Sequence, residues 1–317
     1  MNGDAKIVLQ FPGQGSQRAG MLAKLRLETI GAAAIDEAGA VLELDPMIFD
    51  SAQEQAGTHA TQLGLLIAGV ASARTLAAHG VVADFVAGHS VGAFTAAVHA
   101  QVLRFADALR LVDLRGRLMS EAYPHGYGMA AIAGVPEDTL QEWIDAARAS
   151  GAELHLANRN AVRQFTVSGA DRDLDALVVH ARANGASKAM RLAVATPSHS
   201  PLMAGVAARM SEAIAIATVS DARTPFATNR RARIETSARA IAEDLATGVA
   251  HPVLWSEISE ALYERGVRDF IEVSPGDVLT NLARNRFADA HAVSLDSTGL
   301  SALSLAIGAG TKTRQSD

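Results

Sequence analysis

A short apolar run that ends in Gly88-His89-Ser90-Val91-Gly92 constrains this chain more than any other feature. Residues 83–88 (ADFVAG) are typical of a buried strand, and residues 89–102 have helical composition, so the serine lies on a sharp strand-to-helix turn. Such a turn strains the backbone of Ser90 and needs small neighbours. It presents the hydroxyl at a helix N-terminus, which favours developing negative charge. An accidental Gly-Ser turn is the alternative interpretation.

Strands and helices alternate over most of the chain. The expected strands are Lys6–Phe11 and Asp269–Val273, in addition to the run before Ser90. The expected helices are Thr61–Ala78, Phe105–Met119, Leu202–Ala217, Ser237–Leu245 and Val278–Arg284. This order predicts an α/β fold with a parallel sheet that is covered on both faces.

The middle of the chain has a different order of elements. Strand, helix, strand, strand, helix and strand follow one another at Met129–Ala133, Pro136–Ala149, Leu154–Asn158, Gln164–Ser168, Asp171–Asn184 and Lys188–Ala195. Pro136 is expected in the first turn of its helix and Asp171 as the cap of the other. The order βαββαβ is that of a ferredoxin-like unit. We therefore expect a large α/β-hydrolase-like catalytic domain from residues 1–126 and 199–317, and an inserted ferredoxin-like subdomain from residues 127–198. The tail 308–317 is expected to be a frayed terminus.

Composition argues against several function classes. None of the 317 residues is cysteine, which excludes disulfides, thiolate metal sites and a cysteine nucleophile. Twenty-eight Lys and Arg stand against 34 Asp and Glu, a net charge of −6, and aromatic residues make up 4%. We therefore expect neither a nucleic-acid partner nor a membrane partner. The first residues do not resemble a secretory signal and the apolar stretches are short or interrupted, so we expect a cytoplasmic protein.

A nucleophilic serine needs a base, and the chain has ten histidines. His89 is adjacent to the serine but would point away from its hydroxyl on such a turn. His199 lies in Thr196–Pro201, between two prolines and directly after the last strand of the inserted unit. From there its ring can reach across a cleft. The residues alone leave a catalytic base and a buried structural histidine equally open.

Two further features carry possible chemistry. The loop 12–17 (PGQGSQ) follows the first strand, and its glycines let backbone N–H groups approach a ligand or an oxyanion. A phosphate-binding loop or a simple tight turn is the alternative. Arg115 lies in an otherwise apolar part of its helix, where a guanidinium needs a carboxylate partner. That partner is either structural, Asp113 or Asp107, or the carboxylate of a substrate.

Five motifs together resemble the malonyl-CoA:acyl-carrier-protein transacylases. They are FPGQGSQ from Phe11, GHSVG from Gly88, LRGRLM from Leu114, PSHS from Pro197 and EVSPGDVLT from Glu272. The resemblance extends from Phe11 to about Leu282. It implies transfer of a malonyl group from malonyl-CoA to the thiol of a carrier protein by a ping-pong mechanism. It also implies no permanently bound cofactor and no metal, with a phosphopantetheine-type arm on the carrier as acceptor.

The same resemblance implies roles for the residues that do the chemistry. Ser90 would be the nucleophile, and His199 its general base and acid. The backbone carbonyl of Gly248 would orient that histidine. The backbone N–H groups of Gln14 and Val91 would form the oxyanion hole.

The resemblance also implies which residues bind the substrate. Arg115 would pair with the free malonyl carboxylate, and His89, Asn158 and Asn160 would support the site. Ser274 departs from the glycine that is commoner in the family, and we expect no catalytic consequence.

Three stretches, 59–74, 122–132 and 156–169, resemble more narrowly the malonyl transferase (epsilon) subunit of bacterial malonate decarboxylase. The acceptor would then be that enzyme's carrier subunit with its phosphoribosyl-dephospho-CoA arm. The acyl carrier protein of fatty-acid synthesis is the alternative acceptor. The three basic residues Arg230, Arg231 and Arg233 could dock a carrier or form a solvated loop.

Two other classes of function compete with acyl transfer to a carrier. A serine esterase or thioesterase of the α/β-hydrolase type would use Ser90 with a late histidine, His251 or His291. A non-enzymatic scaffolding subunit would have a degenerate site, against which the complete set of site residues argues.

Overall fold

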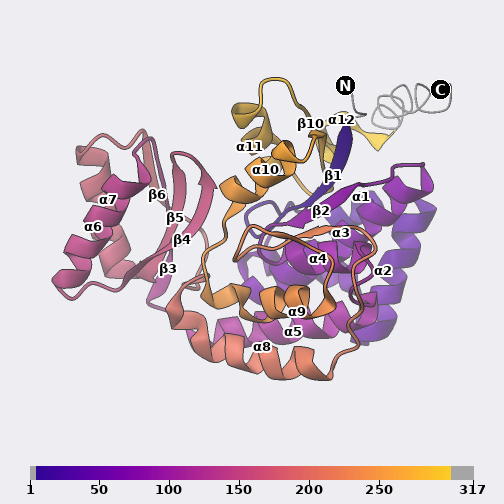
Figure 1. Cartoon of the computed structure of the whole chain (residues 1–317). Coiled ribbons are helices and arrows are strands. Elements are labelled where there is room, and N and C mark those ends of the chain that lie inside the picture. Colours follow the sequence, from indigo (N-terminus) through magenta and orange to yellow (C-terminus); the bar gives the residue numbers. More distant parts are fainter. Residues whose placement is uncertain (1–4, 301–317) are drawn as a thin grey trace.

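A six-stranded sheet forms the centre of the computed structural model, which describes residues 5–300 (Figure 1). Its strand order is β10-β9-β1-β2-β7-β8. The strands are β1 (Lys6–Phe11), β2 (Phe85–Gly88), β7 (Phe226–Ala227), β8 (Ile234–Glu235), β9 (Val267–Glu272) and β10 (His291–Ser294). All neighbouring pairs are parallel except β7 and β8. The predicted parallel sheet is thus confirmed.

Successive residues of the central strand face two different cores. Ile7, Leu9 and Phe11 of β1 pack in one core with helices on one face of the sheet, and Val8 packs in the other. The first face carries α1 (Met21–Leu25), α2 (Thr29–Leu42), α3 (Thr58–Ala78), α4 (Gly92–His99), α5 (Phe105–Ala122), α8 (Ala204–Ile216) and α9 (Ala238–Thr247). The second face carries α10 (Trp255–Glu264) and α11 (Val278–Arg286). Coverage of both faces explains why apolar residues such as Ile7, Val8 and Leu9 follow one another in β1.

Helix α3 has the length and hydropathy of a membrane span, with 21 residues and a mean hydropathy of 1.2. It extends three residues before the predicted start at Thr61. However, 89% of its apolar window is buried inside the protein. It packs between α2 and α5. These contacts are those of a core helix, and among residues 5–300 no second helix meets the same criteria.

A second sheet lies to one side of the first (Figure 1). It is built from β3 (Tyr127–Ala133), α6 (Glu137–Ala149), β4 (Leu154–Ala161), β5 (Gln164–Ala170), α7 (Asp171–Ala183) and β6 (Lys188–Arg191). The strands are antiparallel in the order β4-β5-β3-β6, as in a ferredoxin-like unit. Both helices pack with the sheet around one apolar core. The predicted order of elements is therefore confirmed.

Several predicted boundaries were wrong. Strand β6 ends at Arg191 rather than Ala195. Pro136 is the N-cap of α6 and not part of its first turn. Asp171 is the first residue of α7, whose N-cap is Ala170. Helix α4 begins at Gly92 because Ser90 has a left-handed backbone. The predicted tail 308–317 lies outside the described residues.

Several elements were not predicted at all. They are β7, β8, β10, α1, α2, α10, α12 (Leu295–Thr298) and the 3-10 turns η1 (Pro46–Asp50), η2 (Glu54–Ala56), η3 (Pro201–Met203) and η4 (Gly248–Ala250). Most of them are too short to show a period in the sequence.

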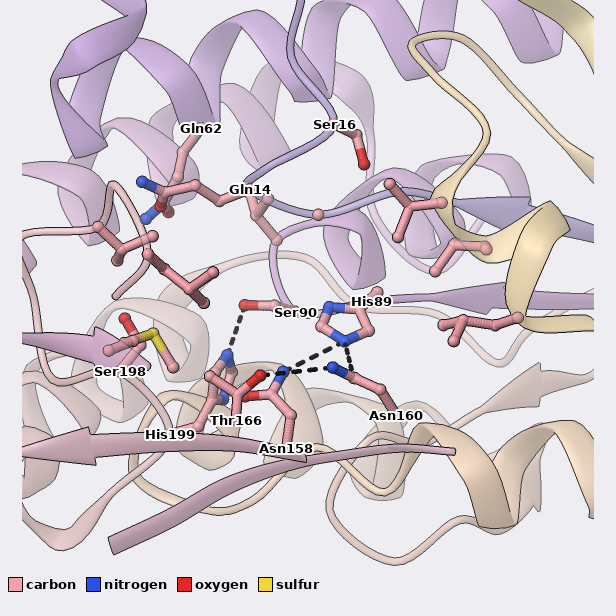
Figure 2. A pocket seen from close by; sticks show the side chains of 18 of the residues that line it. Gln14, Ser16, Gln62, His89, Ser90, Asn158, Asn160, Thr166, Ser198 and His199 are labelled. Atoms are coloured by element: carbon pink, nitrogen blue, oxygen red, sulfur yellow. Dashed lines mark hydrogen bonds between the residues drawn. The ribbon is translucent and has the colours of Figure 1, made fainter. Parts of the chain in front are cut away.

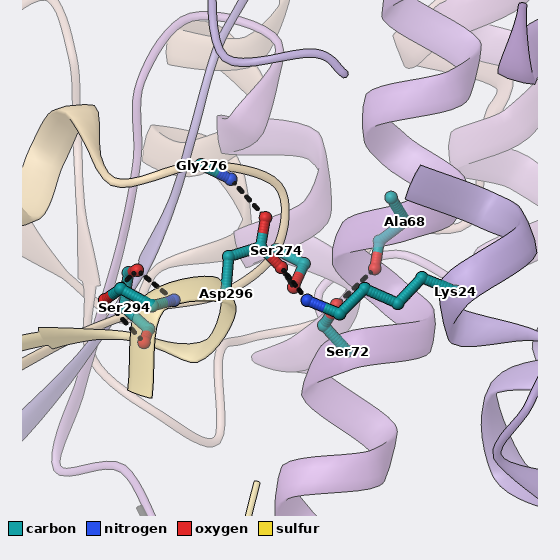
Figure 3. A network of polar contacts seen from close by, with 8 residues as sticks. Lys24, Ala68, Ser72, Ser274, Gly276, Ser294 and Asp296 are labelled. Atoms are coloured by element: carbon teal, nitrogen blue, oxygen red, sulfur yellow. Dashed lines mark hydrogen bonds and ion pairs between the residues drawn. The ribbon is translucent and has the colours of Figure 1, made fainter. Parts of the chain in front are cut away.

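The loop between β9 and α11 is held by the carboxylate of Asp296 (Figure 3). Ser274 Oγ donates to one carboxylate oxygen at 2.5 Å, and the N–H of Gly276 donates to the other at 2.7 Å. Lys24 Nζ lies 3.2 Å from the first oxygen. Burial acts to raise the pKa of Asp296, but these hydrogen bonds and the lysine charge leave that pKa below its usual value. Ser274 therefore has a structural partner outside the cleft.

The turn between β2 and α4 is as crowded as the sequence motif predicts. Ser90 has φ +55°, which non-glycine residues rarely adopt. A Cβ on Gly88 would lie 2.1 Å from the carbonyl oxygen of Gly92, and one on Gly92 would lie 2.2 Å from that of Phe11. Both contacts are with backbone that cannot move away alone. Glycine is therefore required at both positions.

The variant Gly92→Ala tests this crowding. We expect it to lose about 2–3 kcal/mol of unfolding free energy, because the methyl group must push β1 away from α4. Gly205→Ala in α8 is the matched control, since nothing lies within 4 Å of its Cβ. It should gain about 0.5–1 kcal/mol from helix propensity. Urea unfolding measures both values, and equal effects of the two variants would contradict the packing argument.

Candidate active site

Ser90 and His199 meet across the cleft although 109 residues separate them (Figure 2). Nε2 of His199 lies 2.7 Å from Oγ of Ser90. Ser90 follows β2, and His199 lies between β6 and η3, with 4% of its surface exposed. His199 also has a left-handed backbone, with φ +61°. Strained residues of this kind gather at functional sites, and here the two are hydrogen-bonded to each other.

Two backbone carbonyls orient the ring of His199. Its Nδ1 lies 2.9 Å from the oxygen of Gly248 and 3.2 Å from that of His251. Because carbonyl oxygens only accept hydrogen bonds, Nδ1 carries the proton and donates it. Nε2 is then the unprotonated nitrogen and accepts the hydroxyl proton of Ser90. Gly248 lies where the sequence placed it, whereas the carbonyl of His251 was not predicted.

The ring of His199 is neutral at neutral pH. Burial is the largest cause of a lowered pKa, and the positive charge of Arg115 is the next. Together they lower the pKa of His199 to about 3. A neutral ring with a free Nε2 is the form that removes a proton from a serine.

Arg115 lies beside the Ser90–His199 pair, on α5. It is only 3% exposed. Its Nη1 donates to Oε1 of Gln62, and its Nη2 lies 3.2 Å from Ser90 Oγ. Burial lowers its pKa to about 10, which still leaves the guanidinium charged at neutral pH. Buried charge is costly unless it is paired.

The structural carboxylate partners considered for Arg115 are engaged elsewhere. Asp113 contacts His59 and Arg117, and Asp107 contacts two other arginines, Arg104 and Arg110. Within residues 5–300, no carboxylate forms an ion pair with Arg115. The guanidinium is therefore a fixed positive charge next to the serine, and no carboxylate in the described part of the chain balances it.

Two backbone donors flank the serine. Gln14 and Val91 line the same cleft as Ser90. The N–H of Val91 lies at the N-terminal end of α4. Within the described part of the chain, neither N–H donates to a protein acceptor. The loop 12–17 and the β2–α4 turn thus bring to one cleft two residues whose N–H groups are unused within residues 5–300, and backbone donors of this kind stabilise an oxyanion.

His89 points away from Ser90 Oγ and toward the second sheet. Its Nε2 lies 3.1 Å from Oδ1 of Asn160 and 3.2 Å from Nδ2 of Asn158 (Figure 2). Burial lowers the pKa of His89, and its ring packs against Trp255. The Oδ1 of Asn158 is buried and has no hydrogen-bond partner among the residues that the structure describes. These residues join the end of β2 to β4 at the far wall of the cleft.

Residues of both sheets and of α11 line the cleft around Ser90. One wall comes from the central sheet and its loops, and the other from the second sheet through Met129, Gln164 and Thr166. Val278 and Leu282 of α11 add an apolar edge.

Other candidate residues lie elsewhere. The ring Nδ1 of His251 bonds to the carbonyl of Thr247, and exposed His291 lies 3.3 Å from Asp269, so neither ring contacts Ser90. Arg230 and Arg231 both pair with Glu243, which neutralises part of the basic cluster. Among residues 5–300, no three His, Asp or Glu side chains are grouped as a metal site.

Three buried polar residues near the site were missed. Gln62 on α3 holds Arg115, while Asn229 and Asp244 lie behind the Ser90 turn. None belongs to a recognisable motif, because each acts through a contact between distant segments.

Comparison with known proteins agrees with this geometry. The acyl transferase domain family matches residues 8–299. Malonyl CoA-acyl carrier protein transacylase of Bacillus subtilis (strain 168) is 37% identical over 285 residues, which are 88% of this chain and 90% of that protein. The crystal structure of FabD from Acinetobacter baumannii superposes with a TM-score of 0.91 at 32% identity, covering 98% of this chain and 100% of that one.

A second solved structure contains a partner. It is a type II PKS acyl-carrier protein in complex with its malonyl-transacylase, and it matches with a TM-score of 0.90 at 32% identity, over 96% of this chain and 100% of that chain. The present chain therefore belongs to the acyl transferase domain family, and malonyl CoA-acyl carrier protein transacylases are among its relatives.

Proposed function

We propose that this chain is a malonyl-CoA:acyl-carrier-protein S-malonyltransferase. The observation that carries the proposal is the buried Arg115, which has no carboxylate partner among residues 5–300 and whose Nη2 lies 3.2 Å from Ser90 Oγ. A guanidinium binds a carboxylate through two parallel hydrogen bonds. In a malonyl thioester one methylene group separates the carboxylate from the carbonyl carbon. A carboxylate held by Arg115 therefore leaves that carbon within reach of Ser90.

Acylation begins when Ser90 Oγ attacks the thioester carbonyl. His199 Nε2 takes the hydroxyl proton, and the N–H groups of Gln14 and Val91 hold the oxyanion. Each such donor contributes about 3–4 kcal/mol to the transition state. Collapse of the intermediate breaks the carbon–sulfur bond. His199 then returns its proton to the CoA thiol, which leaves a malonyl ester on Ser90.

Deacylation repeats the sequence with a different thiol. The arm of the carrier protein enters the cleft, and His199 removes its proton as the sulfur attacks the malonyl ester. The oxyanion again lies between the two backbone donors. When the ester bond breaks, His199 protonates Ser90 Oγ and restores the resting protein.

An acyl carrier protein is the acceptor that the relatives support, since their names and one solved complex include it. They favour the fatty-acid type of carrier over the carrier subunit of malonate decarboxylase. The resemblance of residues 59–74, 122–132 and 156–169 to the malonate decarboxylase subunit supports that second carrier. We take an ordinary acyl carrier protein as the first acceptor and test both.

Incubation with malonyl-CoA followed by intact mass measurement tests the acyl-enzyme. Wild type should gain one malonyl group, Ser90→Ala should gain none, and His199→Ala should gain it more slowly by about 10³-fold or more. His291→Ala is the control and should react like wild type, whereas an α/β-hydrolase esterase would need that late histidine. Adding each carrier then shows which one removes the group. Free malonate without an adduct would support the esterase and contradict the proposal.

Replacing Arg115 by alanine tests the carboxylate site. We expect the ratio of malonyl to acetyl acylation rates to fall by about 10²-fold or more, because the carboxylate loses a buried ion pair. The protein should still fold, since no carboxylate of the described residues is paired with Arg115. Arg117→Ala, two residues away and paired with Asp113 on the surface, is the matched control. An unchanged ratio in Arg115→Ala would show that Arg115 does not select the substrate.

The proton state of His199 can be measured directly. Its depressed pKa means that the ring stays neutral as the pH falls, and gains a proton only near pH 3. Nitrogen NMR of histidine-labelled protein should show His199 as the Nδ1–H form from about pH 8 to about pH 5. His199→Gln assigns the signal. Arg115→Gln should raise the pKa of His199, because it removes one of the two main causes that lower it. A titration midpoint near 6.5 in wild type would contradict this interpretation.

A further inference from the structure

We infer that Asn229 and Asp244 are positioning residues for acyl transfer, and that helix α9 fixes the nucleophile and the base relative to each other through them. The inference rests on the proposed reaction at Ser90 and adds residues to which neither motif nor resemblance assigned a role.

Asn229 braces the strained turn from behind. Its Oδ1 accepts from the N–H of Ser90 at 2.9 Å, and its Nδ2 donates to the carbonyl oxygen of Gly88 at 2.7 Å. The side chain is buried and reaches the turn from the segment after β7. A left-handed non-glycine residue costs about 1–3 kcal/mol and persists only where its surroundings hold it. The two hydrogen bonds of Asn229 hold the backbone that leads into that residue, from the carbonyl of Gly88 to the N–H of Ser90.

Asp244 in turn fixes Asn229. Its two carboxylate oxygens accept from the backbone N–H groups of Asn229 and Arg230, at 2.8 Å and 2.9 Å. Burial raises the pKa of Asp244 to about 6, so the carboxylate is mostly ionised at neutral pH and both oxygens accept. Asp244 has no contact with Ser90 Oγ. It acts on the nucleophile only through Asn229.

The same helix also reaches the base. Asp244 lies on α9, and Gly248, whose carbonyl orients His199, lies one helical turn further along the chain. Ser90, Arg115, His199, Asn229, Asp244 and Gly248 line a small pocket behind the Ser90–His199 pair. Asp244 in the last turn of α9 therefore acts on the serine backbone through Asn229, and Gly248, the C-cap residue of the same helix, orients the imidazole. The 2.7 Å hydrogen bond between the two side chains depends on this shared support.

The alternative is that Asn229 only stabilises the fold. The variants Asn229→Ala and Asn229→Asp separate the two roles, with Thr228→Val as the control. Thr228 is the neighbouring residue, is equally buried, and bonds through its hydroxyl to both the N–H and the carbonyl of Arg233. The Thr228→Val variant loses these two hydrogen bonds, which should weaken the β7–β8 hairpin and leave the Ser90 turn unchanged.

Two reactions of Ser90 are measured for each variant. One is single-turnover acylation by malonyl-CoA with its KM, and the other is sulfonylation by phenylmethylsulfonyl fluoride, an uncharged reagent that needs no carboxylate site. We expect Asn229→Ala to slow both reactions by about 10²-fold, with KM within about threefold of wild type, because a misplaced nucleophile affects the chemical step. Asn229→Asp keeps the acceptor for the Ser90 N–H, so both of its rates should be about tenfold higher than those of Asn229→Ala. Thr228→Val should lose thermal stability and keep both rates.

Near-wild-type rates in folded Asn229→Ala, within about threefold, would overturn the inference, as would a deficit that follows the folded fraction alone. If Asn229→Ala does not fold, Asp244→Asn tests the inference in its place. The new amide replaces one acceptor oxygen by a donor group, so this variant must slow both reactions of Ser90. Wild type that reacts with the sulfonyl fluoride but never with malonyl-CoA would refute the proposed function. The sulfonylation rates of the variants would then still test the positioning role.

Discussion

The contact between the Ser90 turn and the end of β1 is the constraint on which the site depends. Gly88 pairs with Phe11 in the parallel register of β1 and β2, so the loops that follow both strands start at the same level. Gly92 then allows the first turn of α4 to lie against the carbonyl of Phe11. This close approach places the nucleophile, the N–H of Val91 and the Pro12–Gln14 loop beside one another. A larger residue in this contact would separate them.

Much of the fold could be predicted because its signals are local. The bounds of β1, the turn around Ser90 and the βαββαβ order all follow from short apolar runs and glycine spacing. Strands β7, β8 and β10 have two to four residues, too few to show a period. Their places in the sheet come from tertiary pairing instead.

The site residues also divide into those that a local motif marks and those that only tertiary contacts bring to the site. Ser90, Arg115 and His199 stand in motifs, so the sequence predicted them as candidates. The partner of Arg115 depends on where α3 carries Gln62, which no local pattern shows. The carbonyl of His251 has no side-chain signature at all. Asn229 and Asp244 become visible only when the segment after β7 and α9 are placed behind the turn.

The unbalanced charge of Arg115 also governs how basic its neighbour is. That charge is one of the two main causes of the depressed pKa of His199, and a bound carboxylate cancels it. The imidazole is thus at its least basic in the empty cleft and gains basicity when an acyl group that carries an anion is in place. An uncharged thioester leaves the base in its weak state. Selection of the acyl group is thereby expressed in proton transfer as well as in binding.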